Sequence, residues 1–218
     1  MPHQPLRRLR NTPILSLLSL VAAASATILT ATPAAAMHDW IHGHYYHTAQ
    51  TGQPSMQVRD RNNTSRATIP GNVFDEAIEH WSRAVNRHVT GWVSQSGGGD
   101  PWDCSRANWV VVVCAGGDLG TSWEGDSAIL ATTQNFHWDS SLHLMGSVIR
   151  ISSRCCDTDV RLKNMARHEI GHAFGLGHIT GFQPDSIMLQ AAGSRDRLHY
   201  AVRHDREAMD QMYWWNGH

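Results

Sequence analysis

The chain has 218 residues and a formal net charge of −1, with 18 Lys and Arg against 19 Asp and Glu. This balance gives no electrostatic case for a nucleic-acid partner. The length suits one domain with a sizeable core, once an N-terminal segment is set aside.

Residues 1–36 have the pattern of a secretory signal peptide. The segment begins with three arginines, continues as an apolar run over residues 14–29 and closes with small residues up to Ala36. A transmembrane anchor is the alternative, but the run contains Ser and Thr and falls short of the ~20 apolar residues that span a bilayer. We predict a secreted protein, cleaved after Ala36, that makes no membrane contact afterwards. Without the three arginines, 15 basic residues face 19 acidic ones, a net charge of −4.

Residues 37–55 are rich in His, Tyr and polar residues and show no periodicity. Their four histidines offer metal ligands, but such a composition is more typical of a solvated polar arm. We predict a His-rich arm or a short pro-segment here, followed by one folded domain over residues 56–218.

Apolar periodicity predicts the elements of this domain in chain order. Over residues 73–87, apolar side chains recur at three- and four-residue steps, as on one face of a helix. Five strands are predicted, at 56–60, 88–95, 108–114, 127–133 and 146–153. The β-branched run at 108–114 is typical of a central strand covered on both faces. Two more helices are predicted, one beginning near residues 157–159 and one over about 204–214.

Four cysteines remain in the mature chain, and an even count in an exported protein predicts two disulfides. Cys155 and Cys156 are adjacent and would need strained geometry to bond each other. We therefore expect each of them to bond Cys104 or Cys114, which would tie the central strands to the segment before Arg167. Either of the two crossed pairings satisfies this expectation.

The stretch RHEIGHAFGLGHITG, from Arg167 to Gly181, places three histidines and one glutamate among glycines and apolar residues. His168 and His172 are four residues apart, so on a helix they project from the same side, one turn apart. Two imidazoles in this arrangement can hold one zinc ion. Glu169 lies beside this face, where its carboxylate can hydrogen-bond a zinc-bound water without ligating the metal.

His178 follows His172 by six residues, so a continued helix would point it away from the metal. Gly175 and Gly177 are predicted to end the helix and reverse the chain with positive φ, which brings His178 to the other two imidazoles. Three neutral nitrogens leave one position of a tetrahedral zinc ion open, as in catalytic sites. Zinc lowers the pKa of its bound water toward about 7 and polarises a carbonyl. Glu169 would then take the proton of this water as the water attacks.

The string HEIGHAFGLGH resembles the zinc-binding consensus of the metzincin metalloendopeptidases. Within that clan the chain is most similar to matrixins and their small bacterial relatives, over roughly residues 55–216. Met188, in DSIM, resembles the methionine of the metzincin Met-turn, whose thioether packs under the ligand imidazoles. By similarity, Asp205 hydrogen-bonds the Met-turn backbone; the alternative is a carboxylate that serves only the start of a helix.

The resemblance implies that residues 56–218 form a metzincin-like catalytic domain with an α+β, zincin-like fold. It comprises a twisted, mostly parallel mixed β-sheet, two long helices and a small C-terminal subdomain that ends in a helix. We expect a secreted zinc-dependent endopeptidase with one catalytic zinc ion on His168, His172 and His178 and with Glu169 as general base. Structural calcium has no support in the residues.

The expected partner is a protein or peptide substrate in an extended conformation, paired with an edge strand, for which residues 127–133 are the candidate. Two alternatives stay open. One is a secreted protein that binds zinc without catalysis, and the other is a zinc hydrolase of a non-peptide substrate.

Overall fold

The computed structural model describes eleven ranges of the chain. They are 37–38, 45–46, 55–60, 72–84, 90–95, 103–108, 110–121, 128–137, 143–180, 183–190 and 195–214. The predicted signal peptide and most of the His-rich arm lie outside them. Among the described helices, none combines the length and the apolar character that a bilayer crossing requires.

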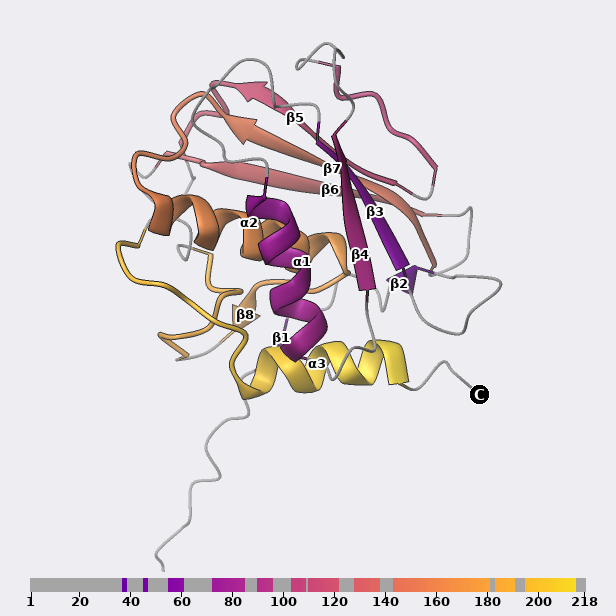
Figure 1. Cartoon of the computed structure of the whole chain (residues 1–218). Coiled ribbons are helices and arrows are strands. Elements are labelled where there is room, and N and C mark those ends of the chain that lie inside the picture. Colours follow the sequence, from indigo (N-terminus) through magenta and orange to yellow (C-terminus); the bar gives the residue numbers. More distant parts are fainter. Residues whose placement is uncertain are drawn as a thin grey trace, which may run out of the picture. The chain divides into compact units, whose positions relative to one another are not determined.

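A six-stranded mixed sheet is the main β structure (Figure 1). Its strands are β2 (Tyr45–Tyr46), β3 (Ser55–Asp60), β4 (Thr90–Gln95), β5 (Val110–Gly117), β6 (Ala131–His137) and β7 (His143–Ser152). The order is β2-β7-β5-β3-β4, and β6 pairs with β7 off this path. Only the β6–β7 pairing is antiparallel within this sheet. The predicted mostly parallel mixed sheet is therefore confirmed.

Three helices accompany the sheet: α1 (Val73–Ala84), α2 (Asp159–Ala173) and α3 (Arg203–Trp214). α1 packs against α2 and β4, and α2 packs against β6 and β7. A second, two-stranded sheet joins β1 (Met37–His38) to β8 (Ile179–Thr180) in antiparallel orientation. The helices begin and end within a few residues of their predicted positions, because capping and periodicity are local signals.

Alternate side chains of β5 enter two separate clusters. Val111 and Val113 join the large core, to which α1 and α2 also contribute. Val110, Val112 and Cys114 join a smaller cluster instead. Successive strand residues point to opposite faces of a sheet. β5 is therefore buried on both faces, as its β-branched run predicted.

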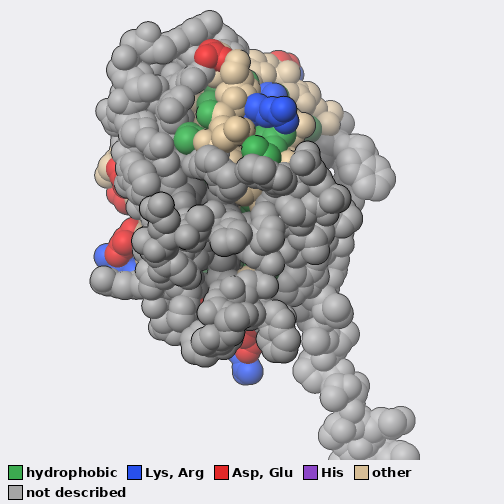
Figure 2. Space-filling view, turned by 90° about the vertical axis from the view of Figure 1, so that its right-hand side faces the viewer, with side chains coloured by type: hydrophobic (Ala, Val, Ile, Leu, Met, Phe, Trp, Pro, Cys, Tyr) green, Lys and Arg blue, Asp and Glu red, His purple; other side chains and the backbone are tan. Residues whose placement is uncertain are grey.

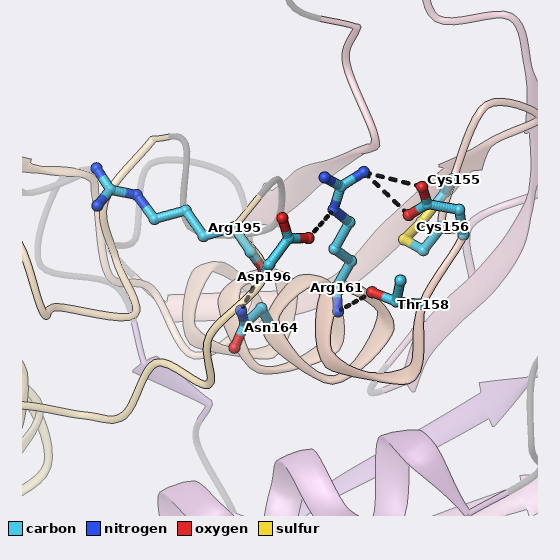
Figure 3. A network of polar contacts seen from close by, with 8 residues as sticks. Cys155, Cys156, Thr158, Arg161, Asn164, Arg195 and Asp196 are labelled. Carbon is cyan, nitrogen blue, oxygen red and sulfur yellow. Dashed lines mark hydrogen bonds and ion pairs between the residues drawn. A yellow bond between two sulfur atoms is a disulfide. The ribbon is translucent and has the colours of Figure 1, made fainter.

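The cysteines pair differently from the prediction. Disulfides join Cys104 to Cys114 and Cys155 to Cys156 (the latter drawn in Figure 3), so the crossed pairing is wrong. Cys114 belongs to the small cluster on one face of β5, and Cys104 packs against the same cluster. Cys155 belongs to the large core on the other face. Crossed bonds would have to pass through the sheet.

The strand predicted at 127–133 lies at Ala131–His137 instead. It pairs with β7 over its whole length, from Ala131 opposite Ile151 to His137 opposite Leu144. Its middle residues are polar on both faces, so the apolar pattern predicted the strand four residues too early.

The described charged side chains are dispersed over the face that Figure 2 draws. On the face drawn in Figure 2, acidic and basic groups lie as scattered points and do not gather into a patch of one sign. Several of them form pairs, among them Arg154 with Asp118 at 2.6 Å and Lys163 with Glu76 at 3.0 Å. These side chains are partly exposed, so each pair contributes about 0–1 kcal/mol to stability.

Candidate metal centre

A chain reversal with Schellman geometry ends α2. The N–H of Gly175 donates to the carbonyl of His172 at 2.8 Å, and the N–H of Leu176 donates to the carbonyl of Gly171 at 3.1 Å. Gly175 has a φ of 102°, a region that glycine adopts without steric cost. The predicted reversal is therefore present. The prediction for Gly177 is wrong, because its φ is not positive and Gly175 alone makes the left-handed step.

The reversal brings His178 to the two histidines of α2. Nε2 of His172 lies 3.0 Å from Nε2 of His168, and Nε2 of His178 lies 3.2 Å from each of them. Within the described ranges, these three residues are the group of His, Cys or acidic side chains placed to share a metal ion. A tetrahedral zinc ion with bonds of 2.0–2.1 Å separates its nitrogen ligands by about 3.3 Å. The triangle of nitrogens therefore fits zinc.

Contacts on the far side of two rings determine which nitrogen faces the centre. Nδ1 of His168 lies 2.8 Å from the carbonyl oxygen of Ile187, and Nδ1 of His172 lies 2.6 Å from that of Leu176. A carbonyl only accepts, so each Nδ1 carries the proton and each Nε2 of a neutral ring presents a lone pair. His178 has at most one Nε2 proton to offer these two lone pairs. A cation between the rings satisfies all three.

Burial keeps His168 in the form that binds metal. Its side chain is 6% exposed, and this desolvation, followed by the neighbouring His178, lowers its pKa to about 4. Metal ligands must be deprotonated, so a neutral imidazole is the required state. No proton has to leave His168 at neutral pH before zinc binds.

Glu169 follows His168 on α2 and is 5% exposed. Burial raises the pKa of its carboxyl to about 7, while the Thr133 hydroxyl, which donates to Oε2 at 2.6 Å, acts in the opposite direction. A group whose pKa lies near the working pH can both accept and return a proton.

Met188 packs directly against α2. It is fully buried, and a Cβ added to Gly171 would meet its sulfur atom and, at 2.8 Å, Cζ2 of Trp81. Gly171 lies between His168 and His172 in the motif. Met188 and Trp81 can approach α2 this closely only because Gly171 has no side chain. Met188 therefore lies against the part of α2 that carries His168 and His172.

Ser186 and Asp205 hold the turn that contains Met188. The N–H of Met188 donates to Oγ of Ser186 at 2.9 Å, and this hydroxyl donates to Oδ1 of Asp205 at 2.8 Å. Asp205 is fully buried and also accepts the N–H of Val202 at 2.9 Å, just before α3. Asp205 therefore accepts a backbone N–H at the start of α3 and is linked to the N–H of Met188 through the Ser186 hydroxyl, so it does not serve the helix start alone.

Sequence reasoning missed three side chains that bind α2 near the histidines. Thr133 and Asn135 lie on one face of β6. Thr133 contacts the Glu169 carboxylate, and Asn135 donates to the carbonyl of His172 at 2.8 Å. Nε1 of Trp81, from α1, donates to another carbonyl of α2 at 2.8 Å. The i, i+2 spacing of Thr133 and Asn135 could have shown that these two residues share a face of the strand. Nothing in the sequence shows that this face meets α2.

Known proteins match this chain over most of its predicted catalytic domain. The matrixin family model matches residues 55–214. Metalloendoproteinase 5-MMP of Arabidopsis thaliana is 30% identical over 174 residues, which are 76% of this chain and 47% of that protein. The chain thus spans about half the length of this curated relative.

A solved zinc-dependent peptidase from Methanocorpusculum labreanum shares 15% identity with a TM-score of 0.38, over 71% of this chain and 99% of that one. So loose a superposition carries no weight for the fold. The match to the family model, by contrast, includes all three histidines and Met188.

Proposed function

Since the chain belongs to the matrixin family, we propose that it is a secreted zinc endopeptidase acting on proteins or peptides. The observation that carries this proposal is the triangle of three Nε2 atoms with a buried carboxyl next to it in the chain. A zinc ion held there would polarise the scissile carbonyl and acidify a water molecule.

The chain's own groups then have separate tasks. His168, His172 and His178 hold the metal through Nε2, and the Nδ1 hydrogen bonds of the first two keep their rings oriented. Glu169 accepts the proton of the attacking water and passes it to the departing amine. The raised pKa of Glu169, about 7, supports this role.

We propose that an extended substrate pairs with β6. Of the described strands, only β7 pairs with β6, which leaves the other edge of β6 without a strand partner in this part of the chain. A peptide can add to such an edge through main-chain hydrogen bonds. Thr133 of β6 contacts Glu169 directly, so a peptide bound along this strand would lie near the proposed base.

We also propose that residues 1–36 are removed as a signal peptide and that residues 37–55 form an arm or pro-segment. The charge and apolar pattern supports the first proposal. The pairing of β1 with β8, directly after His178, supports an arm that stays with the catalytic domain. N-terminal sequencing of the secreted protein is expected to begin at Met37, and a secreted chain that retains residues 1–36 would contradict the cleavage.

The two alternatives make different demands on Glu169. A structural zinc site has no use for a buried carboxyl beside its ligands and usually closes its fourth position with protein. The geometry therefore favours catalysis over zinc storage. A hydrolase of non-peptide substrates shares the same chemistry, so the choice of substrate in the test decides between the two.

The test compares zinc content and casein hydrolysis for the wild type, Glu169→Ala and a control, Glu79→Ala. Glu79 is exposed on α1 and pairs with Arg83. We expect Glu169→Ala to keep one zinc ion per chain and to lose hydrolysis by about 10²–10⁴-fold, since proton transfer contributes that much. The control is expected to match the wild type.

Chelation supplies the second arm of this test. Removal of zinc is expected to abolish hydrolysis while the circular dichroism of the fold persists, and added zinc is expected to restore activity. A Glu169→Ala variant that keeps its zinc and full activity would make the mechanism wrong. Unfolding on chelation, in a wild type that never cleaves casein, would identify a structural metal instead.

A further inference from the structure

We propose that Thr133 is a positioning residue, whose hydroxyl holds the Glu169 carboxylate in the orientation that proton transfer requires. The inference rests on the proposed function. It concerns a residue of β6, the strand along which the substrate would lie, and not a residue of the HExxH helix.

The contact has the geometry of a strong hydrogen bond. Oγ1 of Thr133 lies 2.6 Å from Oε2 of Glu169 and 3.3 Å from the main-chain carbonyl of the same residue. The hydroxyl has one proton, and the shorter contact is with the group that ionises. Hydrogen bonds from a hydroxyl to a carboxylate have lengths of about 2.5–2.7 Å and are roughly twice as strong as neutral ones. The Thr133 hydroxyl therefore donates its hydrogen bond to the carboxylate and not to the main-chain carbonyl.

β6 holds this hydroxyl in place. The next inward-facing residue, Asn135, donates from Nδ2 to the carbonyl of His172 at 2.8 Å and accepts the Ser147 hydroxyl at 2.5 Å. β6 and α2 are thus bonded at two neighbouring points. Threonine is β-branched and has few χ1 rotamers. Its hydroxyl therefore has little freedom to leave the carboxylate.

The bond also divides the work of the two carboxylate oxygens. Oε2 is occupied by the Thr133 hydroxyl, so Oε1 is the oxygen that takes the proton. Without the hydroxyl, the carboxylate would rotate between several orientations in its buried site. A misplacement of about 1 Å can lower a rate by ~10²-fold, because the reacting atoms must be held near their attack geometry.

The same strand would thus both bind the substrate and orient the base. A peptide paired with the free edge of β6 takes its position from the β6 main chain, and Glu169 takes its orientation from a β6 side chain. The distance from Glu169 to the scissile bond would then be set by β6 alone, because β6 positions both the substrate and the base.

The kinetic test uses Thr133→Val, which replaces the hydroxyl by a methyl group of similar size, and Thr133→Ser, which keeps the hydroxyl. Thr121→Val makes the same replacement at an exposed residue outside the proposed site. We expect Thr133→Val to lower kcat by about 10–100-fold with zinc content and KM close to wild type. Thr133→Ser is expected to recover most of kcat, and Thr121→Val to behave as wild type.

Two kinetic outcomes would overturn the proposal. Full kcat in Thr133→Val would show that the hydroxyl does not orient the base. A Thr133→Ser variant as slow as Thr133→Val would show that packing by the methyl group matters instead.

A thermal unfolding cycle tests the contact without reference to activity. It compares the melting temperatures of the wild type, Thr133→Val, Glu169→Ala and the double variant, all without zinc. We expect Thr133→Val to lower the melting temperature of the wild type by several degrees and to leave that of Glu169→Ala almost unchanged. An equal loss in both backgrounds would mean that the two residues are not coupled, and the proposal would be wrong.

The two readouts separate failure of this inference from failure of the proposed function. Coupled melting temperatures in a wild type that cleaves no protein would refute the endopeptidase, and with it the positioning role, while the hydrogen bond itself stands. Hydrolysis by the wild type with uncoupled melting temperatures would refute the role of Thr133 alone.

Discussion

The two ends of α2 are held by different kinds of interaction. At the N-terminal end, Arg161 reaches across the surface to Asp157 at 3.0 Å. It also reaches Asp196 at 2.8 Å, the pair that Figure 3 shows. The side chains of both aspartates are more than two-thirds exposed. Water competes for such pairs, and each contributes about 0–1 kcal/mol.

The C-terminal end, which contains the three site residues of α2, is held by contacts that are buried or partly buried. Trp81 and Asn135 bind its carbonyls, Thr133 binds Glu169, and Met188 packs against Gly171. A polar group that loses its partner inside the protein costs about 1–3 kcal/mol, far more than a lost surface pair. The comparison teaches that buried contacts with several elements fix the functional end of the helix, whereas the exposed ion pairs of Arg161 add little at the other end.

Among the substitutions, Gly171→Ala has the largest expected effect on stability. In an exposed helix this substitution stabilises by about 1 kcal/mol. Here the new Cβ would overlap the Met188 sulfur and the Trp81 ring, so we expect a loss of about 1–3 kcal/mol and weaker zinc binding. Thermal unfolding and zinc titration measure the two effects.

The double variant Gly171→Ala/Met188→Ala is the control for this prediction, because the smaller side chain makes room for the added methyl group. We expect the two losses in stability to be less than additive. An unchanged or higher melting temperature for Gly171→Ala alone would show that the functional end tolerates repacking.

Acid is expected to weaken the buried end through His80 of α1. Nε2 of His80 accepts the N–H of Ala201 at 3.0 Å, and burial, then Arg167, lowers the pKa of this imidazole to about 4 from 6.5. Between these values the unfolded chain binds a proton that the folded chain refuses. The contribution of His80 to stability is therefore complete above pH 6.5 and is lost as the pH falls toward 4, by about 3 kcal/mol in total.

The measurement is the free energy of unfolding between pH 7 and pH 4 for the wild type and His80→Gln, which keeps an acceptor but does not titrate. His168 also has a lowered pKa, but it titrates in both proteins and cancels in the comparison. We expect a shallower pH dependence for the variant. Parallel curves would show that His80 does not contribute.

Arg161→Ala is expected to have the smallest effect. It removes the pairs with Asp157 and Asp196 at the exposed end, so we expect a loss of no more than about 1 kcal/mol, smaller still in high salt. Zinc content and hydrolysis should stay at wild-type values. A loss of stability larger than that of Gly171→Ala would reverse the comparison between the two ends.

The sequence by itself determined the elements whose causes are local. The four-residue step from His168 to His172 and the glycine after the helix place the three imidazoles together, because both follow from the geometry of one chain segment. The β-branched run at 108–114 likewise predicted a doubly covered strand, since burial on both faces requires apolar residues at every position.

Only the tertiary structure decided which faces meet. The disulfide pairing depends on the side of β5 to which Cys114 points, and the place of β6 depends on its register with β7. The hydrogen bond from Thr133 to Glu169 joins residues 36 apart that no motif connects. Contacts of this kind arise when a strand face and a helix face pack together, and no local pattern of residues specifies that pairing.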